Sequence, residues 1–595
     1  MATPHPAIDA AVQQFAQQPG VSPADVSALR AALSSDADLT QRLDTAATSG
    51  ALHGFAPATP GAPDRPVGDY DRTRGVVTLP ASAFPATGTA AAADLHAVLR
   101  VQSMVVDFGG KTYSDGVHAN QPVTPDMLNN LQRTLNNSPA LADEIKRAVT
   151  TTDPLQPSHR ILESFAFTKP GDGVGGSFNA PDHTMNLVSE SLITRGAHSV
   201  GSYNPHDLTF VIGHEVQHGF NAQAAAHGRA TFVTDVRAMA ATPGPVHDYT
   251  ALVEQHIQSG REDEASAQIA GWNALRSRVQ HDQGRVTLTD MANALPARTA
   301  DFIEPHGAGF VPHANVQLNP DLSMPHTPAN VTGMGHNYFD RPTAAHLQPG
   351  DTRNPMGLGH GRAEDYPNYY AGWAVAVIGS EERAAPHHGT PPQIQINMAH
   401  AGLYEDMMEK AGLDLGKSRQ TVPYLDSSTQ PATPHGFDHT VDGPHQYQSV
   451  PAAPTRLDDA NHPDHALFQQ VRGHVVALDH SMGRTPDVHT DQLASAATVQ
   501  ARADGLHRVS QIALSDDGSR LWAVQTPPGR TDHLFDKQSS VPTAEAMTPM
   551  QESAAKWPEA MQQFQQTQQQ QAQSQPLPQQ DQAQAQGPVM THGGR

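Results

Sequence analysis

The chain of 595 residues contains no cysteine. It therefore forms no disulfide bond, and a transition-metal site in it must use histidine and carboxylate ligands rather than thiolates. Without cysteine the fold does not depend on the redox state of its compartment. This suits a protein that is made in the cytoplasm and acts elsewhere.

Basic residues and long apolar runs are also scarce. Lys and Arg number 37 against 60 Asp and Glu, which gives a formal net charge of −23 at pH 7. Such a charge repels phosphate backbones, so we expect no nucleic-acid partner. No apolar run approaches the roughly 18 residues of a membrane helix, so we expect no membrane span. The first residues, MATPHPAIDAAVQQ, lack the basic and hydrophobic regions of a Sec-type signal peptide.

The composition predicts folded cores separated by polar connectors. Hydrophobic residues make up 37% and charged residues 16%, whereas glycine (47) and proline (49) are abundant. We expect a helical or irregular N-terminal region (1–90), a main folded domain (91–430), a Pro/His-rich linker (431–460), a small compact unit (461–540) and a disordered Gln-rich tail (541–595).

The most informative motif is His-Glu-Val-Gln-His at residues 214–218, within an apolar stretch that predicts a buried helix. On a helix His214 and His218 lie one turn apart on one face. Both imidazoles can then bind one Zn²⁺, while Glu215 reaches the water on the metal. With 34 histidines in the chain, a random match is expected roughly 0.1 times, so the neighbouring sequence must support the motif.

A catalytic zinc site needs a third protein ligand and an open position for water. Residues 261–273 predict a second helix that begins with an acidic cluster. We expect Glu262 to be the third ligand, because the small Ala265 on the same face would let the two helices approach closely. Glu264 is the alternative. An acidic cluster at a helix start can also act only by favouring the helix dipole.

The segment before the motif predicts a β-hairpin, with strands at 175–179 and 184–188 joined by a turn. In zinc peptidases an edge strand at this place binds the substrate backbone by β-addition. An ordinary surface hairpin is the alternative interpretation.

The motif at 214–218, followed by the E-x-x-A pattern that begins at Glu262, resembles the gluzincin metallopeptidases. The resemblance implies an α+β, zincin-like domain, in which a small sheet with an edge strand packs on active-site helices. It implies that His214, His218 and Glu262 bind zinc and that Glu215 is the general base. Many gluzincins carry an aspartate directly after the alanine, where this chain has Ser266.

The tetrahedral oxyanion of amide hydrolysis also needs a hydrogen-bond donor. Candidate donors cluster downstream of the motif, and the sequence does not choose among them. They are His336, Tyr338, Tyr366, Tyr369 and Tyr370.

The C-terminal unit predicts a small α+β domain. Residues 466–478 have helical spacing, and the segments 506–515 and 520–526 are strand-like and joined by a turn containing Asp517-Gly518. With the linker before it and the Gln-rich tail after it, this unit resembles the XVIPCD, the C-terminal recruitment domain of antibacterial type IV secretion effectors of Xanthomonadales.

The XVIPCD resemblance implies docking on the ATPase coupling protein of a type IV secretion system, a cognate immunity protein in the producing cell, and a toxin as cargo. We therefore expect a zinc metallopeptidase toxin that is made in the cytoplasm, secreted, and active in the periplasm of the recipient bacterium. Two alternatives stay open. The zinc enzyme could cut peptidoglycan stem peptides instead of proteins, or the chain could be a non-enzymatic secreted binding protein with a vestigial H-E-x-x-H.

Overall fold

The computed structural model describes residues 5–573, apart from 85–88, 170–174, 196–201, 348–353, 360–361, 387–390, 401, 417–420, 430, 442–455, 460–461, 528–532, 534–535 and 549. The chain divides into two compact units, Met1–Ala432 with Gly436–Gln448, and Thr433–His435 with Ser449–Arg595. Each unit mixes helices with small sheets, so the predicted α+β class is confirmed. Much of the predicted linker 431–460 lies outside the described residues.

The N-terminal region is part of the first unit. Helices α1 (Pro6–Ala16), α2 (Pro23–Ser34) and α3 (Ala37–Thr48) precede a sheet of order β1-β3-β2. Its strands are β1 (Gly54–Pro57), β2 (Asp69–Asp71) and β3 (Val76–Leu79). Their apolar side chains share one core with α4 (Thr89–Gly109), α5 (Pro125–Asn136), α6 (Pro139–Thr150) and the start of the motif helix. The region 1–90 therefore packs with the rest of this unit.

The predicted hairpin before the motif is confirmed. Strands β7 (Gly176–Asn179) and β8 (Thr184–Leu187) pair antiparallel, and β6 (Ser164–Phe167) pairs parallel to β8 on its other side. The sheet order is β6-β8-β7, so β7 is an edge strand. His183 turns the chain between β7 and β8 with a positive φ of 51°.

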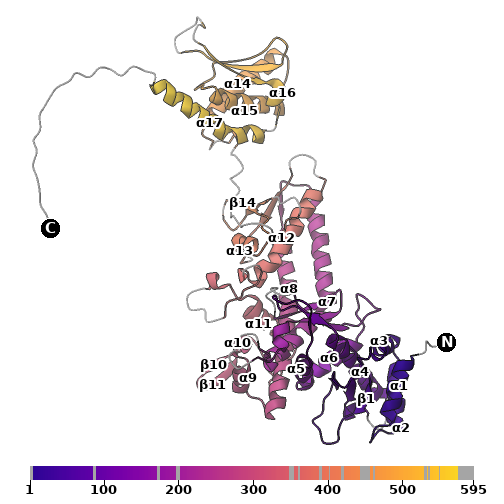
Figure 1. Ribbon diagram of the computed structural model, residues 1–595. Coiled ribbons are helices and arrows are strands. Elements are labelled where there is room, and N and C mark those ends of the chain that lie inside the picture. The colour runs from indigo at the N-terminus through magenta and orange to yellow at the C-terminus, as the bar shows by residue number, and fades with distance from the viewer. Residues whose placement is uncertain are drawn as a thin grey trace, which may run out of the picture. The chain divides into compact units, whose positions relative to one another are not determined.

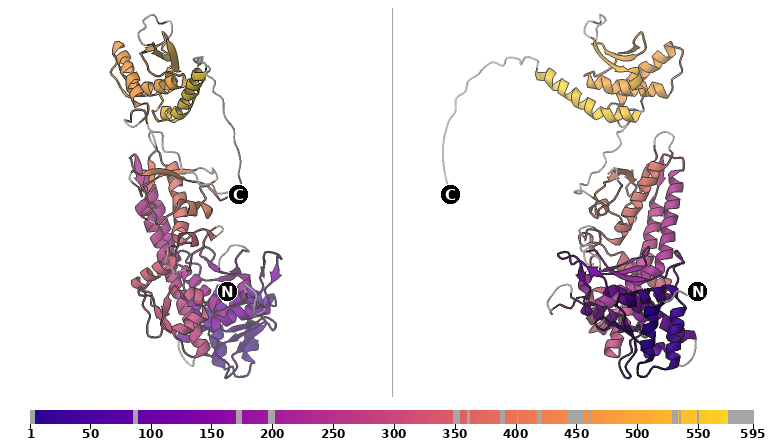
Figure 2. Two further views of the ribbon diagram at one scale, coloured as in Figure 1. Left: turned by 90° about the vertical axis from the view of Figure 1, so that its left-hand side faces the viewer. Right: turned by 45° about the vertical axis from the view of Figure 1, so that its right-hand side comes forward.

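Two long helices form the frame of the first unit. Helices α7 (Pro205–Ala240) and α8 (Thr250–Gln283) run side by side, as both Figure 1 and Figure 2 show. They approach closely near the motif. A Cβ on Gly213 would lie 2.8 Å from the Ala274 Cβ, so a larger residue at 213 would force the helices apart.

The remaining elements of the first unit pack around this helix pair (Figure 1). A core of α8 side chains packs against those of α9 and α11, and a second core involves α12 and the strands β12 and β13. Strands β9 and β13 pair parallel to β12. The helices are α9 (Leu288–Ala294), α10 (Pro296–Thr299), α11 (Pro328–Met334), α12 (Tyr366–Ala384) and α13 (Glu405–Lys410), with a π-helical turn η3 at Gly335–Phe339. The strands are β9 (Val246–Asp248), β10 (Ile303–His306), β11 (Gly309–Pro312), β12 (Gln393–Ile396), β13 (Val422–Asp426) and β14 (Thr433–Phe437).

The second unit has the predicted helix and hairpin. Helix α14 (His465–Ser481) and α15 (Val488–Ala503) pack with an antiparallel sheet of order β15-β16-β17, whose strands are Gln511–Leu514, Arg520–Gln525 and Lys537–Pro542. Gly518 turns the chain between β15 and β16 with a φ of 70°, as the Asp-Gly pair predicts.

The predicted start of the disordered tail at residue 541 is wrong. Residues Thr543–Ala546 form α16 and Met550–Gln573 form the long helix α17. Ala554 and Ala560 are buried in the core of the unit, and Trp557 packs against it. The tail beyond 573 lies outside the described residues. Among the residues that the structure describes, no helix is both long enough and apolar enough to cross a membrane.

Candidate metal centre

The motif lies in the first half of α7, and the local sequence explains why the helix begins where it does. The Asn204 side chain accepts hydrogen bonds from the backbone N–H groups of His206 and Asp207, and Pro205 occupies the first helical turn. Ten residues into the helix, His214 is buried and His218 is partly buried, one turn further on. The predicted helical spacing of the two histidines is confirmed.

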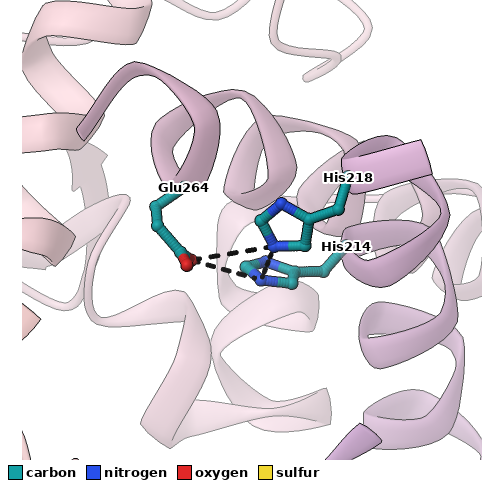
Figure 3. Close-up of side chains that lie close together, drawn as sticks. All are labelled: His214, His218 and Glu264. Carbon is teal, nitrogen blue, oxygen red and sulfur yellow. Dashed lines mark hydrogen bonds and ion pairs between the residues drawn. The ribbon is translucent and has the colours of Figure 1, made fainter. Parts of the chain in front are cut away.

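Three side chains from α7 and α8 converge at this point (Figure 3). The Nε2 atoms of His214 and His218 lie 3.2 Å apart. The Oε2 atom of Glu264 lies 3.5 Å from Nε2 of His214 and 3.8 Å from Nε2 of His218. Among the described residues this is the one group of three or more metal-ligating side chains whose donor atoms come so close together.

The third member of the cluster is Glu264, so the expectation of Glu262 is corrected. Glu262 is exposed and accepts a hydrogen bond from Gln258, one turn earlier on the same helix. Two residues along a helix turn a side chain by about 200°, so the two glutamates face nearly opposite sides of α8. The E-x-x-A pattern also occurs at Glu264, with Ala267 as its last residue, and the sequence contains both registers.

The geometry fits a tetrahedral metal ion. With metal–ligand distances near 2.0–2.2 Å, the ligand atoms of a tetrahedral zinc site are about 3.3–3.6 Å apart, close to the separations in this cluster. Oε2 of Glu264 is buried and has no hydrogen-bond partner among the described residues. A buried carboxylate oxygen without a donor is costly, and a cation between the three atoms would compensate for that cost. Two histidines and a carboxylate are also a donor set that Zn²⁺ accepts.

Asp263 supports the cluster from behind. Its Oδ1 lies 2.9 Å from Nδ1 of His218 and accepts a hydrogen bond from the Asn221 side chain. Burial opposes the charged form of His218, but the carboxylates of Glu264 and Asp263 outweigh it and raise the pKa of His218 to about 10. The bond to Asp263 leaves Nε2 of His218 directed at the cluster. Carboxylates in this position orient metal-binding histidines. In the Glu264 register the residue after the alanine is Gln268, so Asp263 is the carboxylate that orients His218.

Glu215 faces the edge strand β7. Its Oε2 accepts a hydrogen bond of 3.1 Å from the backbone N–H of Phe178. Because β7 pairs with β8 on its other side, this bond shows that the open edge of the strand is turned toward the motif helix. The hairpin therefore lies directly beside Glu215.

Of the candidate oxyanion donors, Tyr338 lies next to the cluster. Its ring contacts that of His214 edge-on, with 6.2 Å between centroids, and its hydroxyl lies 2.9 Å from that of Tyr366. Burial and then the charge of Glu264 raise the pKa of both tyrosines. Both hydroxyls therefore keep their protons near neutral pH and can donate hydrogen bonds. His336 and Tyr369 are exposed.

Arg298 is a charged neighbour that the sequence analysis did not identify. Its Nε donates to Oδ1 of Asp207 at 2.7 Å, and its guanidinium lies over the ring of Phe210. Its charge also acts on Glu215 and Tyr338. The residue stands alone in a short helix, about 80 positions after the motif, so no local pattern marks it; only the packing of α10 against α7 brings it to the cleft.

Comparison with known proteins identifies the second unit. Residues 458–559 match the family model described as X-Tfes, XVIPCD. The match supports the assignment of this unit as an XVIPCD domain, and of the chain as a type IV secretion effector recruited by the type IV coupling protein. It includes all of α14 to β17 and part of α17, in agreement with the folded unit. No curated protein matches the chain.

Proposed function

We propose that the first unit is a zinc-dependent metallopeptidase and that the chain is an antibacterial toxin delivered by type IV secretion. The observation that carries the proposal is the convergence of His214, His218 and Glu264 on one point, with a buried oxygen that has no donor. The H-E-x-x-H order on α7 adds a carboxylate, Glu215, beside that point.

In this proposal His214, His218 and Glu264 hold Zn²⁺, and Asp263 fixes the orientation of His218. A zinc ion bound there polarises a carbonyl group and lowers the pKa of a water molecule to near 7. Glu215 accepts the proton of the attacking water and transfers it to the nitrogen of the leaving amine. Tyr338, oriented by Tyr366, donates a hydrogen bond to the developing oxyanion.

The substrate backbone is proposed to add to the open edge of β7. An extended peptide that pairs with an edge strand uses main-chain hydrogen bonds for affinity and alternate side chains for specificity. This mode of binding suits proteins and also peptidoglycan stem peptides. We propose a polypeptide substrate.

The XVIPCD domain supports the proposed delivery into a recipient bacterium. A secreted toxin of this kind is expected to act in the recipient bacterium, in the periplasm, and to have a cognate immunity protein in the producer. Deleting residues 458–559 should abolish delivery into recipient cells and leave peptidase activity intact. Delivery that survives the deletion would contradict the recruitment role.

The decisive experiment measures zinc content and peptidase activity of the full-length wild type, Glu215→Ala and Glu262→Ala. Wild type and both variants should bind one zinc per chain. Glu215→Ala should lose about 10²–10⁴-fold in activity because the general base is removed. Glu262→Ala, which changes an exposed carboxylate on the neighbouring helix, should keep full activity.

The same proteins distinguish proteolysis from peptidoglycan hydrolysis and from a non-enzymatic binding function. Denatured proteins and purified sacculi are digested in parallel, and cleavage of sacculi alone would replace proteolysis by peptidoglycan hydrolysis. A wild type that binds no zinc and yet inhibits recipient growth as strongly as before would favour a non-enzymatic binding protein.

A further inference from the structure

A second cavity opens on the same face of α8 as Glu264. It has a volume of about 310 Å³ and lies between α7, α8, α12 and α13, with the exposed charged residues Arg229 and Asp414 at its border. Its walls are mainly aromatic and aliphatic, and the larger of these side chains are Tyr369, Tyr370, Trp373, Met408 and Leu413. Tyr369 and Trp373 are 53% and 39% exposed, which is unusual for side chains of this size and marks the open mouth of the cavity.

Two buried polar groups lie in the wall of this cavity. Glu364 is 3% exposed, and its side chain makes no hydrogen bond to the residues that the structure describes. His256 is 5% exposed, and its Nδ1 is buried without a partner in that same part of the chain. Burial, and then the charge of Asp365, raise the pKa of Glu364 to about 9. The cavity therefore has a neutral carboxyl group that can both donate and accept.

A continuous row of rings connects the cavity with the metal centre. Tyr338 beside His214 contacts Tyr366, which stacks on Phe339. Phe339 contacts Tyr370, whose ring lies directly over Gly260 of α8. A Cβ at position 260 would collide with Tyr370, so glycine is needed there.

Helix α8 gives the distance between the cavity and the candidate metal centre. His256 and Glu264 are eight residues apart on α8, which is about 12 Å along the helix axis. An extended peptide covers this length in about three to four residues, at roughly 3.3 Å each.

We propose that this cavity is a side-chain pocket of the substrate cleft, which binds an aromatic residue of a polypeptide about three to four residues from the bond that is cut. The inference rests on the proposed peptidase function and deepens it. Aromatic walls and a few polar groups at depth match an aromatic side chain, whereas a sugar ring would need partners for several hydroxyls. Stem peptides of peptidoglycan carry no aromatic side chain, so the pocket favours proteins as substrates.

The first test uses Gly372, which lies in α12 on the cavity wall. A Cβ at this position would meet the Leu413 side chain at 3.7 Å and Glu364 at 4.0 Å, both ordinary contacts. Gly372→Leu should therefore fill the cavity, and Gly372→Ala is the matched control that leaves it open. Cleavage sites in a denatured protein mixture are first mapped with the wild type. Matched peptides are then compared that carry Phe or Ala three or four residues from the cut.

The wild type and Gly372→Ala should cleave the Phe peptide with kcat/KM about 10-fold or more above the Ala peptide. Gly372→Leu should lose this preference and cleave the Ala peptide as the wild type does. The proposal is overturned if the wild type shows no preference at any position within five residues of the cut. It is also overturned if Gly372→Leu slows both peptides equally.

A binding measurement distinguishes failure of the pocket from failure of the peptidase function. Zinc-loaded Glu215→Ala is titrated with Ac-Ala-Ala-Phe-Ala-NH₂ or its all-Ala analogue, and tryptophan emission is followed with excitation at 295 nm. A saturable change in tryptophan emission with the Phe peptide supports the pocket, even if no peptide is cleaved. This change should be absent after Trp373→Phe or Gly372→Leu. If the wild type cleaves peptides but this signal does not saturate, the pocket assignment fails and the peptidase function stands.

Discussion

Two buried carboxylates, one in each unit, show how a candidate ligand site differs from a structural ion pair. Glu264 in the first unit is 8% exposed and Asp464 in the second is 5% exposed. Asp464 is saturated, since it accepts hydrogen bonds from Arg502 at 2.5 and 2.9 Å and from Trp557 at 2.8 Å. Oε2 of Glu264 has no donor in the part of the chain that the structure describes, and it faces two imidazole nitrogens.

The difference teaches that burial alone does not identify a functional carboxylate. Burial works against the charged form of Asp464, but the bonds from Arg502 and Trp557 outweigh it and lower its pKa. All its partners are part of the chain, so its role is complete within the fold. In the proposed function a cation from outside completes the Glu264 cluster.

The largest effect is expected for Glu264→Ala. Loss of one of three ligands should remove zinc and reduce peptidase activity by at least about 10⁴-fold, or more than about 5 kcal/mol of transition-state stabilisation. Zinc content by elemental analysis and kcat/KM check this expectation, with Glu262→Ala as the control two residues away. If Glu262→Ala lost the metal and Glu264→Ala kept it, the assignment of the two glutamates would be reversed.

In the second unit, Asp464→Ala should destabilise the fold and leave the metal centre untouched. It leaves the partly buried Arg502 guanidinium without its partner, which costs about 3 kcal/mol. Urea unfolding followed by tryptophan fluorescence measures the loss, and zinc content should not change. Asp458→Ala is the matched control, because its ion pair with Arg456 is about 40% exposed and contributes at most about 1 kcal/mol. Equal effects of both variants would contradict the buried role of Asp464.

Glu144 in α6 is a buried carboxylate with more compensation than Oε2 of Glu264 and less than Asp464. It is largely buried, and its ion-pair partner Arg147 is 3.9 Å away, so burial raises its pKa to about 7 against the weaker effect of Arg147. The folded protein then keeps a proton that the unfolded chain releases above about pH 4.5, so the free energy of unfolding falls as the pH rises from about 5 to 7.

Glu144→Gln removes this titration. We expect the variant to be more stable than the wild type by roughly 2–3 kcal/mol at pH 8 and similar to it at pH 4.5. Thermal unfolding at both pH values checks the expectation. Glu304→Gln, at an exposed position, should show no such difference. A constant offset between Glu144→Gln and the wild type at every pH would contradict the proton linkage.

The smallest effect is expected for Asp263→Asn, which keeps the size of the side chain that orients His218. Loss of the charge should weaken zinc affinity or activity by about 10–100-fold, or about 1–3 kcal/mol. Competition with a chelator measures the affinity. Ser266→Ala changes a partly buried hydroxyl on the same helix, and it should have no effect. A loss with Ser266→Ala equal to that with Asp263→Asn would show that the wrong residue was assigned this role.

Local sequence patterns predicted those helices and strands that are specified by residues close together in the chain. The helix around 214–218, the hairpin β7–β8 and the strand pair β15–β16 were predicted from periodicity and turn residues, and all are present. Helix α17 was missed because its Gln-rich composition conceals the spacing of Met550, Ala554, Trp557 and Phe564. That spacing predicts a helix only when the core against which these residues pack is known.

The sequence alone determined which types of donor group the candidate metal centre can have. Without cysteine, and with two histidines one turn apart on a helix, the donors had to be imidazole and carboxylate. It did not determine which carboxylate, because Glu262 and Glu264 belong to one helix and both fit the E-x-x-A pattern. Only the packing of α8 against α7, close at Gly213, decides which face of α8 meets the histidines. That packing brings together residues about 50 positions apart, and no local signal in the chain records it.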